Sequence, residues 1–383
     1  MIGKTRLISL LIAGLFLVSC GPQNRNTSEG AGTLSSDTLQ TELSPRYAEG
    51  FRVSIRPDGV KLLSIQEPDN AHAVPELFAL IPHGMQADIP EGYAPISVPV
   101  QRVICMTTPQ LANFTGLEAY DKVVATSNTR RMQNKEWLER MKNGKVKKIG
   151  MEGNFDTEII IASNPDIIFV SPSRRGGYES MKELGIPLIP HWAFKETSPL
   201  GLAEWIKVAG MFIGKEEEAC RTFDAMETKY SRLKDLVAEV KHRPTIFSGE
   251  MRNGTWYVPG GQSFYARLFM DAGADYFMKD NPDTGGVLMD FETIYAKGYD
   301  MEYWRVMNGY KGTFTYNALK ASNPQYADFR AFKEKKVLYC NLEYIPLYEN
   351  LPLSPDILLS DMIKAFHPEI LPEYQPVFYS LLE

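Results

Sequence analysis

The sequence predicts an α/β fold with two lobes, mainly parallel sheets in each lobe, one long rigid helix between the lobes and a small N-terminal β appendage. Short apolar runs alternate with helical segments on both sides of residues 199–243, which indicates right-handed βαβ units. Residues 199–243 contain no strand candidate. A local pattern also recurs in the second half of the chain, which indicates two lobes of related design.

The composition is that of a globular protein. The chain has 383 residues, enough for two domains and a small addition, with 44% hydrophobic and 23% charged residues. The formal net charge is −6, and no basic excess is present to neutralise phosphates. We therefore expect no nucleic-acid partner.

Residues 1–19 have the pattern of a signal peptide. Lys4 and Arg6 precede an apolar run from Leu7 to Val18, which is too short to span a bilayer. Residues 17–21, LVSCG, resemble the lipobox of bacterial lipoproteins, in which the cysteine is diacylated after cleavage. Lipidation of Cys20 is expected, and an ordinary secretory signal with a chance cysteine is the alternative.

Residues 20–44 are rich in Asn, Thr, Ser, Gly and Gln, which predicts a disordered tether. Removal of residues 1–19 takes away Lys4 and Arg6, so the mature net charge is −6 − 2 = −8. Anionic headgroups repel such a body, so the lipid has to provide the anchoring. We expect a membrane-anchored lipoprotein of the periplasm or cell envelope.

The β appendage covers residues 45–101. Alternating segments at 51–56 and 60–65 flank a Pro-Asp-Gly turn and predict a hairpin. A proline-rich stretch follows to residue 101.

The first lobe is expected at residues 102–198, with strands at 103–105, 123–125, 167–170 and 188–190. The linking helices follow at 199–243. Gly214 breaks them, and residues 215–240 read as one helix with apolar residues at three- and four-residue spacing. Pro244 ends this helix, and the second lobe follows at 244–383 with strands at 245–247, 299–304 and 337–340.

The repeat consists of four residues spaced identically in both lobes: Asp156, Glu158, Ile160 and Asp166 recur as Asp290, Glu292, Ile294 and Asp300. In each copy a short helix carries the glutamate and a strand follows the second aspartate. The two glutamates should therefore occupy equivalent exposed positions.

The remaining cysteines after Cys20 are Cys105, Cys220 and Cys340, each within an apolar or helical pattern. We interpret them as buried small side chains, with a disulfide or metal site as the alternative. The five histidines are scattered without ligand spacing, so no metal site is expected.

Several segments resemble the periplasmic binding proteins of ABC importers for iron-siderophore complexes, haem and cobalamin, the class whose lobes are joined by a single rigid helix. The similarity extends from Arg102 to Glu383. The matching segments are residues 153–159 (GNFDTEI), 164–168 (NPDII), 256–261 (WYVPGG), 271–274 (DAGA), 290–292 (DFE) and the tail 354–369. The β appendage is additional, and Tyr299 stands where the second lobe often has proline.

The resemblance implies an ABC permease and its ATPase as partners. It also implies that one glutamate of each lobe docks onto arginines of the permease, and by position these are Glu158 and Glu292. The alternative is that both are solvated carboxylates favoured by the helix macrodipole. A monomer is expected.

The ligand should lie between the lobes, in loops that follow the carboxyl ends of the strands. The candidate ligand-binding residues are Thr108, Arg130, Arg131, Asn154, Arg174, Arg175, Trp192, Arg252, Trp256, Tyr257, Tyr316 and Tyr344. Aromatic faces and arginines suit a bulky anionic chelate. The arginines could instead pair with surface acids.

The resemblance and these residues predict binding of a ferric siderophore, with a cobamide or haem as alternatives and no intrinsic cofactor. No G-x-S-x-G, G-x-G-x-x-G or H-E-x-x-H motif is present, so an enzyme is not expected. A carbohydrate-active enzyme, which needs only two carboxylates, and a structural surface lipoprotein are the remaining alternatives.

Overall fold

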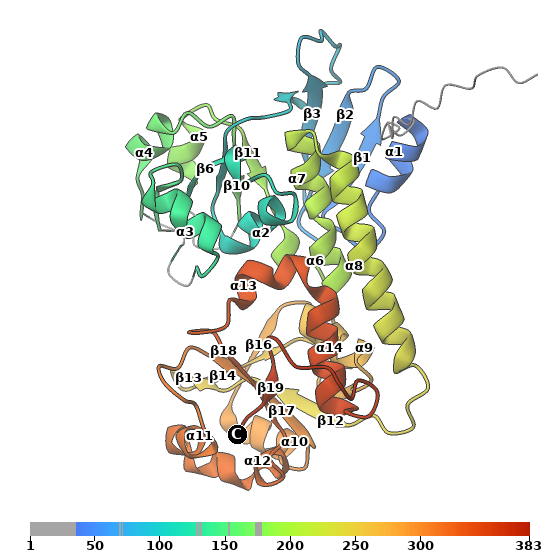
Figure 1. The fold of residues 1–383 in the computed structure, drawn as a ribbon, viewed down its shortest axis with the longest axis vertical. Coiled ribbons are helices and arrows are strands. Elements are labelled where there is room, and N and C mark those ends of the chain that lie inside the picture. The colour runs from blue at the N-terminus through green and yellow to red at the C-terminus, as the bar shows by residue number, and fades with distance from the viewer. Residues whose placement is uncertain are drawn as a thin grey trace, which may run out of the picture. The chain divides into compact units, whose positions relative to one another are not determined.

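The computed structural model describes residues 36–68, 70, 72–127, 129, 132–151, 154–172 and 178–383. The expected signal peptide, Cys20 and most of the expected tether lie outside the described residues. Ser35–Glu383 form one compact unit, and within it the predicted α/β fold with two lobes is confirmed (Figure 1). In the described part of the chain, no helix combines the length and apolar character needed to cross a bilayer.

The N-terminal region is more ordered than the sequence indicated. Residues assigned to the tether form helix α1 (Ser36–Leu43), and Leu43 is fully buried. The predicted hairpin is confirmed as β1 (Phe51–Ile55) and β2 (Lys61–Ile65). The proline-rich stretch adds β3 (Glu76–Pro82) and β4 (Ala94–Val98), giving a four-stranded sheet in the order β1-β2-β3-β4. Proline is tolerated at these strand ends and at the edge of the sheet.

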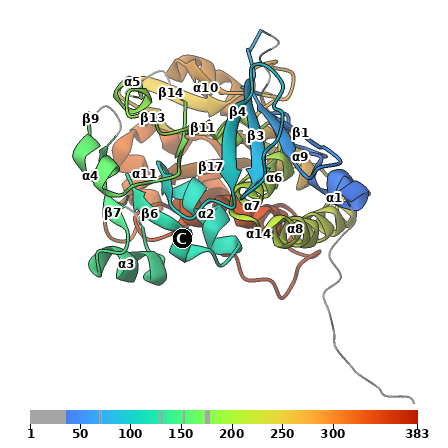
Figure 2. The same ribbon diagram turned by 90° about the horizontal axis from the view of Figure 1, so that it is seen from above.

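This sheet is an integral part of the first lobe's core. Alternate residues of its strands, such as Phe51, Leu63 and Leu80, are buried. They pack in one core with helices α7 (Ile206–Ile213) and α8 (Glu216–Leu236). Figure 2 shows β3 and β4 beside α7 when the fold is seen from above. The sheet therefore braces the helices that join the lobes.

Two buried carboxylates tie the chain before β1 to these helices. Glu204 accepts hydrogen bonds from the backbone N–H groups of residues 46–48 at 2.8–3.0 Å. Glu196 accepts from the N–H groups of residues 49 and 50, and from the Trp205 indole. Glu204 also pairs with Lys207 at 2.8 Å, and neither side chain exposes any surface. Five consecutive N–H groups thus find partners that no secondary structure provides.

The first lobe contains a parallel five-stranded sheet in the order β11-β10-β5-β6-β7. Its four predicted strands are confirmed. The strands are β5 (Val103–Cys105), β6 (Val123–Thr126), β7 (Lys147–Lys148), β10 (Ile167–Val170) and β11 (Leu188–Pro190). The flanking elements are α2 (Thr108–Gly116), α3 (Lys135–Lys142), hairpin β8–β9 (Gly150–Met151 and Asn154–Phe155), α4 (Thr157–Ala162) and α5 (Glu179–Lys182).

The lobes are joined by α6 (Pro199–Glu204), α7 and the long helix α8. Gly214 breaks the helices as predicted, because it ends α7 with φ +71°, a conformation that glycine adopts easily. Helix α8 ends at Leu236, four residues before the predicted end at residue 240. It packs along the closing helix α14 (Pro355–Phe366) of the second lobe.

The second lobe contains a five-stranded sheet in the order β15-β12-β17-β18-β19, parallel except for β19. The strand predicted at 299–304 begins only at Tyr303, because Tyr299 ends helix α10. The strands of this sheet are β12 (Thr245–Ser248), β15 (Asp275–Tyr276), β17 (Tyr303–Asn308), β18 (Val337–Asn341) and β19 (Ser380–Leu381). A second sheet consists of β13 (Met251–Arg252), β14 (Thr255–Pro259) and β16 (Gly286–Met289). The helices are α9 (Phe264–Asp271), α10 (Phe291–Gly298), α11 (Tyr316–Ser322), α12 (Arg330–Lys333), α13 (Leu347–Asn350) and α14.

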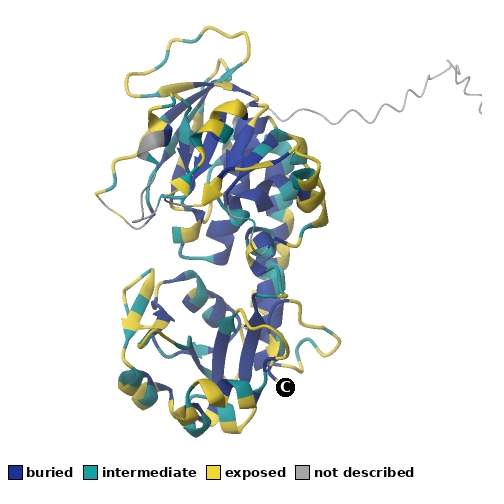
Figure 3. Cartoon of the chain, turned by 90° about the vertical axis from the view of Figure 1, so that its left-hand side faces the viewer, coloured by how far each residue is buried: buried dark blue, intermediate teal, exposed yellow. Residues whose placement is uncertain are grey.

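A second connection between the lobes runs through α13 and the short turn Leu351–Leu353, which both pack on α2. The largely buried Glu349 carboxylate accepts hydrogen bonds from the N–H groups of Gln133 and Asn134 in the first lobe. Figure 3 shows the buried residues gathered in the sheets and in the helices between the lobes.

Cys105, Cys220 and Cys340 are free and buried, which confirms their interpretation as small core side chains. Burial raises the pKa of each thiol. They are therefore kept in the thiol form, which is the unreactive form.

The Glu204→Ala substitution is expected to reduce the free energy of unfolding by about 3–5 kcal/mol, because it leaves the Lys207 ammonium buried without its partner. It also removes the acceptor for three backbone N–H groups. Denaturant unfolding monitored by circular dichroism measures the loss.

Arg221→Ala on α8 is the control, because it breaks a surface pair with Glu217 and should cost less than about 1 kcal/mol. Equal losses for both variants would contradict a structural role for the buried pair.

Candidate functional site

A cavity of about 750 Å³ lies between the two lobes of the compact unit. Its walls come from loops at the carboxyl ends of the parallel strands in both lobes. Thr107 follows β5 and Ser171 follows β10, whereas Gly249 follows β12. This edge of a parallel sheet is the usual place for a ligand site.

The first-lobe wall has a polar part, and among the described residues it carries no free charge. Thr107 is the N-cap of α2. Gln110 completes a capping box, because its side-chain oxygen accepts hydrogen bonds from the N–H groups of Met106 and Thr107. Ser171 and His191 complete the polar part of this wall.

The His191 ring is neutral. It is 4% exposed and lies between aromatic rings, 4.7 Å from Trp205 and 5.8 Å from Phe169 between centroids. Burial lowers the pKa of His191 to about 3, because an imidazolium in this position would lack solvation. The ring pairs with the Asn113 amide at 3.2 Å. His191 therefore contributes a neutral surface to the cavity.

Glu196 also borders the cavity, but its carboxylate already serves the fold. It is 3% exposed and holds residues 49–50 and the Trp205 indole by hydrogen bonds. Burial raises the pKa of Glu196, and these hydrogen bonds oppose the shift. Its oxygen atoms are thus directed to the N-terminal chain.

The second-lobe wall contains a buried cation, Arg305, at the centre of β17. The side chain is 4% exposed, and its guanidinium donates to the hydroxyl groups of Tyr379 and Ser248 and stacks 3.8 Å from the Tyr265 ring centroid. Burial alone would lower the pKa of Arg305, but the tyrosine oxygens raise it, so the group stays charged. In the described part of the chain, no carboxylate lies within 4.0 Å of this guanidinium.

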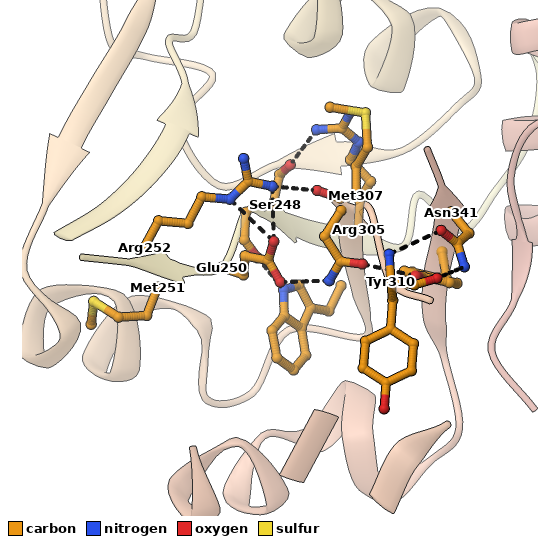
Figure 4. Close-up of polar contacts among 12 residues, drawn as sticks. Ser248, Glu250, Met251, Arg252, Arg305, Met307, Tyr310 and Asn341 are labelled. Atoms are coloured by element: carbon orange, nitrogen blue, oxygen red, sulfur yellow. Dashed lines mark hydrogen bonds and ion pairs between the residues drawn. The ribbon is translucent and has the colours of Figure 1, made fainter. Parts of the chain in front are cut away.

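A second guanidinium lies at the rim of the same wall. Arg252 is exposed, donates to Glu250 at 2.8 Å and also to the Met307 carbonyl. Glu250 accepts in addition from the Asn308 amide at 2.9 Å. Figure 4 shows Arg252, Glu250, Ser248 and Arg305 grouped together, with Ser248 at the end of β12 and Arg305 opposite it on the neighbouring strand β17. Two guanidinium groups and one carboxylate leave this wall with a net positive charge.

The rest of the lining is largely apolar and aromatic. These residues are Pro109, Ala193, Phe194, Leu202, Tyr257, Pro259, Phe264, Tyr265, Met307, Tyr348, Leu351 and Pro352. Phe194 and Tyr257 are 50% and 54% exposed, so their rings are available for contact. The site therefore suits a bulky ligand with an apolar or aromatic body and negative charge directed at the second lobe. No group of three metal-binding side chains occurs in the described residues.

The structure brings two of the predicted ligand-binding residues into the cavity wall, Arg252 and Tyr257. Thr108 lies beside this wall, one residue after Thr107, and Trp192 lies beside Phe194, against which it stacks. Asn154 is exposed on β9 and Tyr344 is exposed outside the lining.

Two predicted residues lie in the second-lobe core. Trp256 is fully buried against Phe247 and Trp304. Its indole N–H can be buried there because it donates a hydrogen bond to the Ser248 carbonyl. Tyr316 is 6% exposed and its hydroxyl accepts from the N–H of Val337. Neither lines the cavity. Arg130, Arg131, Arg174 and Arg175 lie outside the described residues.

Sequence reasoning missed Arg305, together with its partners Tyr265 and Tyr379. A signal was present, because a single arginine interrupts the apolar run of residues 303–307. Charged residues inside a strand that is buried on both faces are rare and mark sites of function. The predicted strand ended at residue 304 and so excluded it.

The repeat has the predicted local structure. Asp156 and Asp290 are the N-caps of α4 and α10, and each carboxylate accepts from the N–H three residues later. Glu158 and Glu292 lie in the first turns and are exposed, whereas Ile160 and Ile294 are fully buried. Both lobes thus present one glutamate in the same way.

The family model described as "Periplasmic binding protein" matches residues 103–344. An uncharacterized lipoprotein of Methanocaldococcus jannaschii is 27% identical over 300 residues, which are 76% of this chain and 70% of the relative. A second uncharacterized lipoprotein of that organism is 25% identical over 386 residues, which are 96% of each chain.

Among solved structures, a periplasmic binding protein from Veillonella parvula aligns with a TM-score of 0.58 at 15% identity, over 80% of this chain and 98% of that one. A periplasmic heme binding protein from Pseudomonas aeruginosa gives 0.56 at 17% identity, over 74% and 98%. An ABC-type Fe³⁺-hydroxamate transport system structure from Saccharomonospora viridis gives 0.54 at 16% identity, over 70% and 94%. These likenesses show the shared fold.

The neutral state of His191 predicts acid sensitivity. Because its pKa is lowered to about 3 in the folded protein and is about 6.5 when unfolded, the unfolded chain takes up a proton first as the pH falls. The stabilisation is complete above pH 6.5 and declines by up to about 1.4 kcal/mol per pH unit below it. Denaturant unfolding at pH 7, 6, 5 and 4 should show a flatter dependence for His191→Gln than for the unsubstituted protein.

His72→Gln, in an exposed loop, is the control for removal of a histidine. Parallel pH curves for the unsubstituted protein and His191→Gln would show that His191 is not the acid-sensitive group.

Proposed function

Because the chain belongs to the periplasmic binding protein family, we propose that it captures an anionic metal chelate between its lobes and delivers it to the permease of an ABC importer. The observation that carries this proposal is Arg305, a buried cation in the cavity wall without a carboxylate partner among the described residues. A buried charge that lacks a counter-ion is costly. An anionic ligand would supply the missing negative charge.

A ferric siderophore is the ligand we favour. Siderophore complexes are bulky and often anionic, which fits a 750 Å³ cavity with two guanidinium groups and aromatic faces. Arg252 and Tyr257 are proposed ligand contacts beside Arg305. Arg130, Arg131, Arg174 and Arg175 remain proposed contacts on the sequence argument alone.

Haem is the second candidate, and a cobamide is the third. The aromatic lining supports a flat macrocycle, and haem carries two propionates that could pair with Arg305 and Arg252. One structure with the same fold is a heme binding protein, and another belongs to an Fe³⁺-hydroxamate transport system. A cobamide would use the apolar lining more than the guanidinium groups.

We propose that Cys20 carries a lipid anchor that holds the protein at the outer side of a membrane. The residues 17–21 support this proposal, as does the description of two relatives as lipoproteins. The binding protein would act as a monomer and as a solute carrier, without enzymatic turnover. Its partners would be an ABC permease and the associated ATPase.

Glu158 and Glu292 are the proposed docking residues for that permease. Each is exposed in the first turn of a helix that is capped by an aspartate, and the two helices recur at equivalent places in the two lobes. Two matched carboxylates would fit two basic sites on the permease.

The Arg305→Gln substitution is expected to weaken binding of an anionic chelate more than tenfold, because a hydrogen bond to a charged group contributes about 1.5–3 kcal/mol. Arg252→Gln should cost less, since Arg252 is exposed and shared with Glu250. Fluorescence titration with a ferric tris-catecholate, haemin and cyanocobalamin at two salt concentrations measures both effects.

Arg330→Gln on α12, where the arginine pairs with Glu334 outside the cavity, is the matched control. If Arg305→Gln binds every anionic probe with unchanged affinity, the proposal of an anionic ligand is wrong. Turnover of a ligand by the purified protein would instead support an enzyme.

Glu158→Arg and Glu292→Arg are expected to reduce uptake by cells while the dissociation constant of the isolated protein stays within twofold. The reason is that both carboxylates lie outside the cavity lining. Uptake of labelled chelate, compared with titration of the purified variants, separates transport from binding.

Asp235→Arg, an exposed acid on α8, controls for the change in net charge. If Asp235→Arg lowers uptake as much as Glu158→Arg does, the docking assignment is wrong.

A further inference from the structure

The hydroxyl of Tyr379 fixes the direction of the buried guanidinium. It accepts from Nε of Arg305 at 3.1 Å and from Nη2 at 2.5 Å, so one oxygen holds two adjacent donors of the same planar group. Ser248 Oγ accepts from Nη1 at 3.2 Å on the other side. A planar fork held at both sides cannot rotate freely about its long axis.

Tyr379 is itself held by a buried carboxylate rather than by strand pairing alone. Its residue precedes β19, which pairs antiparallel with β18 over only two residues. Asp361 on α14 is fully buried and accepts from three consecutive N–H groups, those of Val377, Phe378 and Tyr379, at 2.7–2.9 Å. The hydroxyl of Tyr374 donates to the same carboxylate at 2.8 Å.

A continuous chain of contacts therefore leads from α14 to the cavity. Asp361 orders residues 377–379, the backbone of that segment sets the place of the Tyr379 ring, and the Tyr379 hydroxyl sets the guanidinium of Arg305. The Tyr265 ring stacks on the guanidinium, and its hydroxyl lies 3.3 Å from the Tyr379 hydroxyl. All four side chains are buried or partly buried, so solvent does not compete with these contacts.

We propose that Tyr379, held by Asp361, is a positioning residue that aims Arg305 at the ligand and thereby sets the preference of the cavity for anionic over neutral chelates. This inference rests on the proposed function. The C-terminal segment is then a part of the binding site, although none of its residues lines the cavity. A tail with only a structural role would affect stability but not the preference between ligands.

Tyr379→Phe removes only the hydroxyl group that holds Arg305. We expect at least a tenfold loss of affinity for the anionic chelate that the unsubstituted protein binds, with a weaker dependence on salt. Affinity for cyanocobalamin, a probe without net charge, should change less than twofold or remain undetectable in both proteins. Fluorescence titrations at 50 and 300 mM salt give both quantities.

Tyr374→Phe is the matched control. It removes one hydroxyl from the same segment and one hydrogen bond to the same Asp361, but among the described residues Tyr374 makes no contact with Arg305. It should lower stability to denaturant without changing affinity or the salt dependence. Equal losses of affinity in Tyr374→Phe and Tyr379→Phe would overturn the inference.

A crystal structure of Tyr379→Phe separates this inference from the proposed function. The inference requires that the guanidinium of Arg305 turns away from its position beside Ser248. An unchanged guanidinium would overturn the inference even if the unsubstituted protein binds anionic chelates. If the unsubstituted protein binds none of the anionic chelates, the proposed function and the selectivity that rests on it both fail, and the structure of the variant still decides whether Tyr379 positions Arg305.

Discussion

Buried carboxylates that accept backbone N–H groups hold this molecule together where secondary structure does not. Glu204 and Glu196 together fix residues 46–50, and Asp361 fixes residues 377–379. Glu349 does the same for two residues across the lobes. A buried N–H without a partner is costly, so each carboxylate specifies the path of an irregular segment as well as stabilising it.

The cavity depends on these segments at both ends. Glu196 borders the cavity while it holds the chain before β1, and the segment held by Asp361 carries the tyrosine that contacts Arg305. The positions of the first-lobe and second-lobe walls are thus set by parts of the chain that are more than three hundred residues apart. The N-terminal sheet adds to this rigidity, because its buried face shares a core with the helices that join the lobes.

Apolar runs and apolar spacing predicted most of the parallel strands and α8, whereas the two-residue strands β7 and β15 were not predicted. Strands β3 and β4 were not predicted, because the proline-rich sequence obscured the alternation of buried and exposed residues. The site was harder to predict. Trp256 was expected in the site and lies in the core, because its indole donor is satisfied inside a sheet. Arg305 was not among the candidates and lines the cavity, because tyrosines hold it there. Those partners come from distant segments, and the sequence pattern carries no information about them.

The chemistry of Arg305 restricts how a cargo can leave. A guanidinium keeps its proton in any ordinary surroundings, and acid only favours the charged form, so no ordinary change of pH removes the positive charge of Arg305. The His191 ring at the cavity also keeps its charge state, because burial lowers its pKa to about 3 and holds it neutral. Under the proposed function, unloading therefore has to be mechanical. The lobes must be drawn apart until water replaces the wall opposite Arg305, and the work of separation has to come from the permease.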